Sequence, residues 1–272
     1  MKAFHVVCGL PRSGSTLLCN ILAQNKAFHV RHTSEVVMKL RSSMAAGTES
    51  AEVKGSFAHD PRDTDETSWR EGRSIVESYH DPKKVNFDKS RGWNDMQFVL
   101  EKLYPEARII CCVRDLRAVF GSQERNWRRN PMFMIPPGLI GRQRMNNQFS
   151  PDGMIGGPLT AIEDLLLYEN PRVLFVRYEN LTDKPKLMMQ QIYQHIGEPY
   201  FEHDFKDIKN TATDPDWLYL GKFPHYGNGE VKDRTDWQQF VPRQFADEIM
   251  QPRYEMGARH HWYNQAFGYM GE

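Results

Sequence analysis

A glycine-bearing loop near the amino terminus has the residues and the spacing to hold a phosphate group. Gly9 and Gly14 fall in the frame Gly-x-x-x-x-Gly-x-Ser/Thr, between a short apolar run and a helical pattern. In such a loop the backbone N–H groups and the amino end of the next helix converge on one point and favour a bound anion. Nucleoside-triphosphate loops place a lysine before the final Ser or Thr, but this chain has Ser15 there, so Arg12 is the cation of the loop. The loop predicts an anion site; the alternative is a strand-to-helix turn that binds nothing.

A second polar group follows the clearest strand pattern, residues 109–113. Arg114 comes directly after this run, and Ser122 lies about two helical turns further on. An arginine fork at the carboxyl end of a strand and a hydroxyl on the next helix can hold one phosphate from two sides. The alternative for Arg114 is a structural ion pair with Asp115 or Glu124. The other arginines of this helix are expected on its solvated face: Arg117, Arg125, Arg128 and Arg129.

These two groups carry a family resemblance. The run from Pro11 to Leu17 resembles the 5′-phosphosulfate loop of the sulfotransferases, which transfer a sulfuryl group from 3′-phosphoadenosine 5′-phosphosulfate (PAPS). Its Arg-Ser-Gly form is most similar to the tyrosylprotein and carbohydrate branches, since the cytosolic small-molecule branch usually has Lys at this arginine. The family holds the 3′-phosphate of PAPS with an Arg and a Ser at the spacing of the second group. The resemblance therefore implies these donor-binding residues: Pro11, Arg12, Ser13, Gly14, Ser15, Thr16, Arg114 and Ser122.

Two further segments resemble parts of the same family. Tyr178 begins a Tyr-Glu-Asn-Leu run that is similar to a Tyr-Glu-x-Leu segment whose tyrosine lies near the nucleotide. The alternative is a half-buried packing residue. Residues 226–237 end in Asp-Trp and resemble a late loop that closes over the 3′-phosphate. The usual Arg-Lys-Gly triplet is absent there, so Lys232 and Arg234 are the candidates to replace it, and the alternative is a solvated surface loop.

The catalytic groups follow from what sulfuryl transfer needs: a base on the acceptor, a cation on the leaving phosphate, and positioning. Arg12 is the candidate cation. The resemblance makes Lys89 a second catalytic cation, and the alternative is an exposed salt bridge. The cytosolic branch places its catalytic His two residues after this lysine, where this chain has Arg91. The base is therefore expected elsewhere.

Glu35 is the candidate base. It follows the first helix, as the catalytic Glu does in the tyrosylprotein branch. A glutamate serves as a base for an alcohol when it is desolvated and aimed at the hydroxyl. Ser34 and Glu35 also read as the start of a helix, so a role at a helix terminus is an alternative. His32 is a second candidate base, because an imidazole titrates near neutral pH.

Composition excludes several classes of function. The 272 residues include 35 basic and 35 acidic side chains, so the formal net charge is zero. This balance argues against nonspecific binding to nucleic acid or to an acidic membrane, which needs a basic excess. No stretch approaches the ~18 apolar residues of a membrane span, and the amino-terminal run is too short for a signal peptide. The cysteines lack metal-ligand spacing and predict reduced thiols in a cytoplasmic protein: Cys8, Cys19, Cys111 and Cys112.

The elements that must position these residues alternate between short apolar runs and amphipathic segments. This pattern predicts one α/β domain over residues 1–272, with a mostly parallel sheet flanked by helices. The resemblance implies the P-loop-like sulfotransferase fold. Strands are expected at 4–8, 109–113 and 173–176, and a helix after Pro185 is expected to end at Gly197. Two polar segments, near 44–84 and 130–158, are expected to be irregular lids, binding loops or surface insertions.

The sequence therefore predicts a sulfotransferase that takes PAPS as donor and releases 3′,5′-diphosphoadenosine (PAP). The expected acceptor carries a hydroxyl on a small molecule, a carbohydrate or a peptide, and no metal is expected. Two alternatives remain. One is a P-loop kinase for a small metabolite, which would need magnesium. The other is a non-catalytic nucleotide-binding module.

Overall fold

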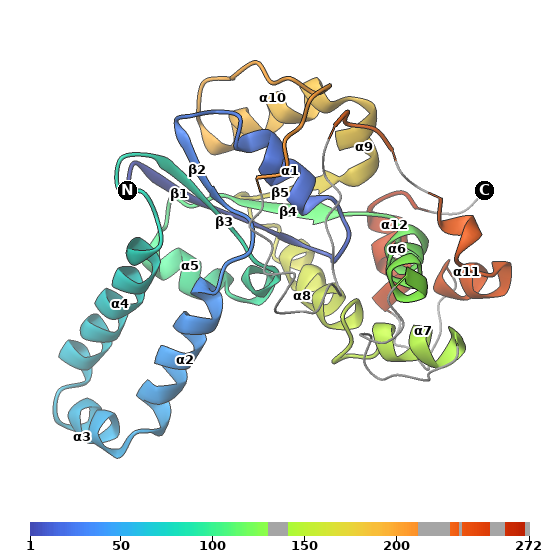
Figure 1. The fold of residues 1–272 in the computed structure, drawn as a ribbon. Coiled ribbons are helices and arrows are strands. Elements are labelled where there is room, and N and C mark those ends of the chain that lie inside the picture. Colours follow the sequence, from blue (N-terminus) through green and yellow to red (C-terminus); the bar gives the residue numbers. More distant parts are fainter. Residues whose placement is uncertain (130–140, 212–228, 234–235, 251–258, 270–272) are drawn as a thin grey trace.

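Five parallel strands form the centre of the structure, a computed structural model that describes residues 1–129, 141–211, 229–233, 236–250 and 259–269 (Figure 1). The strands are β1 (Ala3–Gly9), β2 (Phe28–Arg31), β3 (Val85–Lys89), β4 (Ile109–Val113) and β5 (Val173–Arg177). Their order in the sheet is β2-β3-β1-β4-β5, and all four neighbouring pairs are parallel. All carboxyl ends therefore lie at one edge. The chain places β2 and β3 on one side of β1 and then β4 and β5 on the other, and open α/β sheets bind ligands at such a change of side.

Helices cover both faces of this sheet (Figure 1). One face is covered by α1 (Ser15–Leu22), α9 (Tyr178–Asp183) and α10 (Pro185–Ile196). The other is covered by α5 (Gln97–Leu103), α6 (Leu116–Arg129), α7 (Gly141–Phe149), α8 (Gly156–Leu167), α11 (Arg243–Met250) and α12 (Arg259–Ala266). The described residues also include the short 3₁₀ helices η1 (Arg91–Asp95) and η3 (Trp237–Gln239). The predicted α/β fold with a parallel sheet is confirmed. Within the described ranges, no helix is both long and apolar enough to cross a membrane.

The strands alternate their side chains between two cores. Cys8 and Cys111 face the core that contains α5, α6 and α8, whereas Val7 and Cys112 face the core that contains α1 and α10. The adjacent Cys111 and Cys112 therefore point to opposite faces of the sheet, and all four cysteines are buried and free. Burial raises the pKa of the Cys19 thiol to about 12. It also raises the pKa values of Cys111 and Cys112, so these thiols stay protonated and pack as small apolar side chains.

The expectation that residues 44–84 are irregular is wrong. This segment is mostly helical, in α2 (Val36–Glu49), α3 (Ala51–His59) and α4 (Pro61–Ser78), which extend from the sheet as a helical arm (Figure 1). The polar residues act as helix starts: Ser50 Oγ accepts a hydrogen bond from the N–H of Val53 (3.4 Å), and Asp60 Oδ1 accepts one from Asp63 (3.1 Å). Pro61 follows at the first position of α4, where its missing N–H costs nothing.

The second segment expected to be irregular, 130–158, is also partly helical. Residues 130–140 lie outside the described ranges, whereas α7 occupies Gly141–Phe149 and α8 begins at Gly156. Buried Met145 and Phe149 give α7 an apolar side that packs on the core. By contrast, the predicted end of α10 is confirmed: Gly197 caps it with a φ of 71°, a left-handed conformation that favours glycine.

His5 is a buried histidine of the central strand β1, and it should make the stability of the fold sensitive to acid. His5 Nδ1 accepts a hydrogen bond from the backbone N–H of Arg108 (3.1 Å). Burial, together with the nearby charges of His195 and Arg108, lowers the pKa of His5 to about 3. The unfolded chain takes up a proton near pH 6.5, but the folded chain does so only near pH 3. Stability is therefore lost as the pH falls from 6.5 towards 3, and the loss at pH 5.5 is about 1.4 kcal/mol.

His5→Asn tests this prediction, because it keeps an acceptor and removes the titration. The fall in unfolding free energy between pH 7.5 and 5.5, measured by urea denaturation, should be about 1.4 kcal/mol smaller than in the wild type. The same change at His59, which is exposed on α3, should leave that fall unaltered. An identical fall in the wild type and in His5→Asn would contradict the prediction.

Candidate active site

The loop between β1 and α1 is held in place by the strand beside it and by η1. Gly9 has a φ of 118°, and a Cβ there would overlap the carbonyl group of Cys112, so only glycine fits. The N–H of Gly9 donates to Asn94 Oδ1 (2.8 Å), and Asn94 Nδ2 donates back to the Gly9 carbonyl (3.2 Å). Asn94 lies 85 residues away and carries no motif, so sequence reasoning missed it.

Two further residues of the loop have a positive φ. Arg12 has a φ of 59°, which is uncommon for a residue with a side chain. Gly14 has a φ of 88°, and a Cβ there would come within 2.6 Å of the Tyr178 ring. Ser13 is buried and donates to the Leu10 carbonyl (2.6 Å). The loop therefore keeps a strained shape that the surrounding contacts maintain, which is typical of ligand sites.

The two polar groups predicted from the sequence meet in space. Arg12 Nε donates to Ser122 Oγ (3.0 Å), and Arg114 donates from its guanidinium to the Arg12 carbonyl (3.0 Å). The Arg114 guanidinium also lies 3.9 Å from the centre of the Tyr178 ring, a cation–π contact. The alternative of an ion pair with Asp115 or Glu124 does not describe the structure. Those carboxylates pair instead with two other arginines, Arg117 (2.6 Å) and Arg144 (2.6 Å).

These residues surround a pocket of about 390 Å³. Its lining consists of Arg12, Gly14, Ser15, Thr16, Leu17, Arg114, Ser122, Arg125, Asn126, Arg129, Tyr178, Glu230 and Lys232. Cations therefore outnumber carboxylates five to one among the described lining residues. Such a pocket favours a compact polyanion. Pro11 and Ser13 do not line it; both are buried in the loop behind it.

The expectation of a solvated helix face is wrong for Arg125, which is half-buried, whereas Arg129 is exposed as expected. Both line the pocket, as does Asn126 between them, because α6 turns this side towards the loop. Arg125 also pairs with Asp236 (3.1 Å). The orientation of α6 depends on its packing against η3, where an added Cβ at Gly121 would lie 2.7 Å from Trp237. That contact joins distant segments and leaves no pattern in the sequence.

Part of the late loop reaches the same pocket. Lys232 and Glu230 line it, and Trp237 lies against the Arg117 guanidinium (5.0 Å from the ring centre). Lys232 is exposed and lies beside the arginines, so its role in anion binding stays a prediction. Arg234 and residues 226–228 lie outside the described ranges, so the expectation for Arg234 stays a prediction.

The strand order places the remaining candidates in a row along the carboxyl edge. In the order of the sheet, β2 ends shortly before Glu35, β3 ends at Lys89, and β1 leads into the loop. β4 ends just before Arg114, and β5 just before Tyr178. Neighbouring strands are about 4.8 Å apart, so β2 lies about 10 Å from β1. Lys89 Nζ donates to Thr16 Oγ1 (2.9 Å) and so joins the end of β3 to the first turn of α1.

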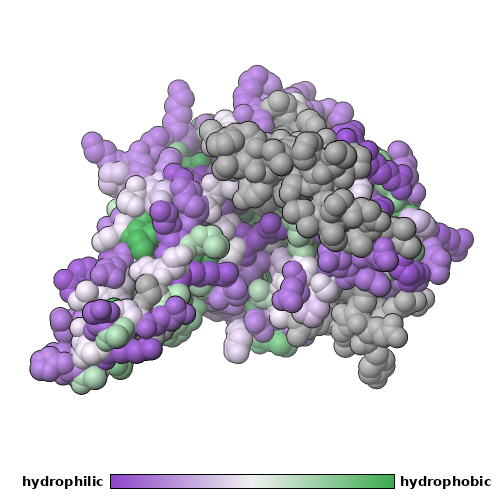
Figure 2. Space-filling view, turned by 60° about the horizontal axis from the view of Figure 1, so that its bottom comes forward, coloured by the Kyte–Doolittle hydropathy of each residue, from purple (hydrophilic) through white to green (hydrophobic). Residues whose placement is uncertain are grey.

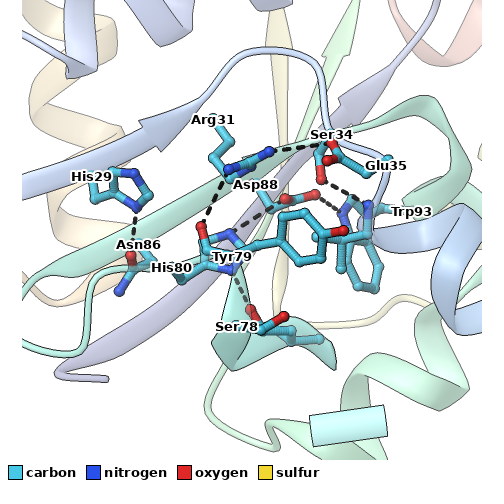
Figure 3. A network of polar contacts seen from close by, with 12 residues as sticks. His29, Arg31, Ser34, Glu35, Ser78, Tyr79, His80, Asn86, Asp88 and Trp93 are labelled. Carbon is cyan, nitrogen blue, oxygen red and sulfur yellow. Dashed lines mark hydrogen bonds and ion pairs between the residues drawn. The ribbon is translucent and has the colours of Figure 1, made fainter. Parts of the chain in front are cut away.

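The two candidate bases differ in their surroundings. Glu35 is half exposed and pairs with Arg31 (3.2 Å), whose guanidinium also donates to the Tyr79 carbonyl (3.4 Å; Figure 3). The Glu35 carbonyl accepts the first hydrogen bond of α2, so the predicted helix start is confirmed. His32 is buried, and its Nε2 is hydrogen-bonded to Thr211 Oγ1 (2.8 Å). Neither side chain lines the pocket, so both stay candidates for the acceptor side.

A buried polar network beneath Glu35 supports the loop (Figure 3). Asp88 accepts a hydrogen bond from Trp93 Nε1 (2.7 Å) and lies 3.3 Å from His80 Nε2. Trp93 belongs to η1, which also supplies the Asn94 that holds Gly9. The network therefore ties the end of β3 to the start of the loop. Among the described residues, no three His, Cys, Asp or Glu side chains lie together as a metal site requires.

This fold and pocket define an α/β protein in which a strand–loop–helix unit borders a cationic pocket. The sequence profile of the Sulfotransferase family matches residues 6–202. The chain therefore belongs to the sulfotransferase family. No curated protein sequence matches it significantly.

Solved structures of sulfotransferases share the fold. The sulfotransferase domain from the curacin biosynthetic pathway has a TM-score of 0.54 and 16% identity, and 98% of each chain is covered. The sulfotransferase domain from the Synechococcus PCC 7002 olefin synthase has a TM-score of 0.52 and 18% identity, and 98% of this chain and 94% of that chain are covered. Mouse sulfotransferase SULT7A1, solved in complex with PAP, has a TM-score of 0.52 and 10% identity, and 94% of this chain and 87% of that chain are covered.

Proposed function

We propose that this protein transfers a sulfuryl group from PAPS to the hydroxyl group of an acceptor. The observation that carries the proposal is the meeting of the loop with Arg114 and Ser122 around one cationic pocket. A sulfotransferase of the same fold has been solved with PAP, the product that PAPS leaves after transfer. The pocket fits this class of ligand, because five cations and one carboxylate line its described part, which suits a ligand with several phosphate charges.

Each donor-side residue has a defined part in this proposal. Ser15, Thr16 and the N–H groups of the loop donate to the 5′-phosphate, and Arg12 neutralises the charge that develops on it. Arg114 and Ser122 hold the 3′-phosphate, and Tyr178 lies beside the adenine ring. Lys232 and Arg234 close over the 3′-phosphate from the late loop. Arg125 and Arg129 add positive charge on the same side of the pocket.

The acceptor-side residues move one proton. Bound PAPS supplies the sulfuryl group, whose bond to the 5′-phosphate oxygen breaks as the acceptor oxygen bonds to sulfur. The Glu35 carboxylate takes the hydroxyl proton of the acceptor, and Lys89 stabilises the transferring group beside Thr16. The contact with Arg31 orients Glu35 at the end of β2. The acceptor is a hydroxyl-bearing small molecule, carbohydrate or peptide.

Glu35→Gln tests the base. We expect kcat to fall by about 10²- to 10⁴-fold, because the amide cannot take a proton. The affinity for PAP, measured by calorimetry, should stay within about twofold, since Glu35 lies outside the pocket. Glu49→Gln, at the other end of α2, is the matched control and should keep wild-type turnover. If Glu35→Gln keeps full turnover and His32→Gln loses it, His32 is the base.

A further inference from the structure

The helical arm carries a groove away from the nucleotide pocket. Side chains of α2, α3, α4 and α5 enclose a space of about 1000 Å³. The large apolar side chains of its lining are Leu40, Met44, Val53, Phe57, Trp69, Val99 and Leu103. Leu40 and Leu103 are buried at its base, but Phe57 is 52% and Met44 43% exposed. A set of large apolar side chains that converges on one open groove is typical of a binding surface.

The arm is thinly packed for a three-helix unit. α3 has no buried residue, and α4 buries only Gly72 and Val76 among its 18 residues. The arm packs closely at its base, where a Cβ at Gly72 would meet Leu103 and Leu40 at 3.4 and 3.5 Å. Most helical stability in proteins comes from packing of an apolar face, so the outer part of the arm would gain stability from a helix laid into the groove.

The charge of the lining indicates the chemistry of the partner. Four carboxylates line the groove, from Glu52, Asp63, Asp65 and Glu71, against one cation, Lys54. Figure 2 shows hydrophilic and hydrophobic residues side by side on the arm, at the lower left of the view. An apolar base with an acidic rim is complementary to a ligand that has an apolar side and basic groups beside it.

The dimensions indicate a helical segment. The part of α4 that lines the groove runs from Asp63 to Gly72, which is about 14 Å, or two and a half turns. We propose that the groove binds a basic amphipathic helix of a partner protein, with its apolar side between α2 and α4 and its Lys or Arg residues against the acidic rim. Met44 suits this role, because its flexible side chain adapts to different partners. This docking site is independent of the proposed transfer reaction.

A designed peptide tests the proposal on the full chain. A fluorescein-labelled amphipathic peptide of about 14 residues, with Leu on one side and Lys on the other, is titrated and followed by anisotropy. We expect saturable binding that weakens as salt is raised, because the rim carboxylates face water. A matched peptide with Glu in place of Lys should bind at least about tenfold more weakly.

Paired substitutions locate the binding. Met44→Ser should weaken binding by about tenfold, whereas Met38→Ser, at an exposed methionine of α2 outside the groove, should change it less than twofold. Asp65→Lys should weaken binding by about fivefold, and Glu66→Lys, one residue away and outside the lining, should have little effect. Circular dichroism and thermal unfolding check that each variant is folded, and PAP affinity should be unchanged in all four.

Several results would overturn the proposal. Absence of peptide binding at 1 mM is one, and equal binding of the basic and acidic peptides is another. Equal effects at Met44 and Met38 would place the peptide elsewhere. A dimer that Met44→Ser dissociates would identify a second copy of this chain as the occupant. Binding of neutral Nile red that Met44→Ser abolishes, with no binding of the peptide, would assign the groove to a small apolar ligand.

Discussion

Arg12→Ala is expected to lower the kcat/KM for sulfuryl transfer by about a thousandfold. Arg12 supplies the only guanidinium within the loop itself, between Gly9 and Thr16. A cation held at the leaving phosphate acts mainly in the transition state, where negative charge develops on the bridging oxygen. Its loss should therefore lower turnover more than donor binding. The measurement is the initial rate of sulfate transfer, with PAP affinity measured in parallel.

Arg12→Gly separates the side chain from the backbone. Glycine adopts the φ of 59° at this position without strain, so this variant should fold at least as well as Arg12→Ala. Both variants should lose activity equally if the guanidinium matters. Recovery of activity in Arg12→Gly would mean that the shape of the loop, and not the charge, had been lost. Full activity in Arg12→Ala would contradict the proposed role.

Arg114→Ala is expected to raise the Kd for PAP by about a hundredfold. Arg114 is 6% exposed, donates to the Arg12 carbonyl and lies over the Tyr178 ring. Its loss removes a buried cation from the predicted 3′-phosphate site and one hydrogen bond from the loop. The preference for PAP over AMP, which lacks the 3′-phosphate, should fall towards one. Calorimetry with both nucleotides measures this preference.

Arg172→Ala is the matched control for this variant. Arg172 lies just before β5, at the opposite edge of the sheet, and pairs with Glu101 (3.0 Å). Its removal should leave both nucleotide affinities within about twofold. If Arg114→Ala weakens PAP and AMP equally, the arginine supports the loop and does not read the 3′-phosphate.

The sequence predicts best those parts of the fold that are continuous and apolar. The expected strands at 4–8, 109–113 and 173–176 correspond to β1, β4 and β5. β2 and β3 were missed because polar residues interrupt them. Asn86 and Asp88 are both fully buried in β3, where Asn86 donates to the Asp81 carbonyl and Asp88 contacts His80 and Trp93. Buried polar residues interrupt the apolar run, and short-range patterns do not show that they are satisfied.

In the candidate site, too, the sequence predicts the local patterns and does not predict the residues that reach the site through tertiary packing. The loop and the Arg114–Ser122 pair are local patterns, and the structure brings them within hydrogen-bond distance of each other. Asn94 and Arg125 were missed as site residues because their roles depend on how η1 and α6 pack, which short-range patterns do not encode. The polarity of residues 44–84 predicts an irregular segment, whereas the structure has the helical arm there. Capped, exposed helices have the same composition as loops.

Zero net charge conceals the main electrostatic feature of this chain. The 35 basic residues balance the 35 acidic ones overall, yet the described lining of the pocket has five cations and one carboxylate, Glu230. Elsewhere many charges pair with each other, as Arg144 does with Glu124 and Arg142 with Glu248. The distribution of charge therefore indicates the ligand, and the total does not.

Ligand-dependent thermal unfolding of the wild-type protein tests the central claim most directly, since it needs no acceptor. At a PAP concentration about a hundredfold above Kd, bound ligand adds about 2.7 kcal/mol to stability, which should raise Tm by roughly 5 °C or more. ATP with magnesium, and NAD, should raise it far less. Stabilisation by ATP with magnesium and not by PAP would contradict the account and favour a kinase.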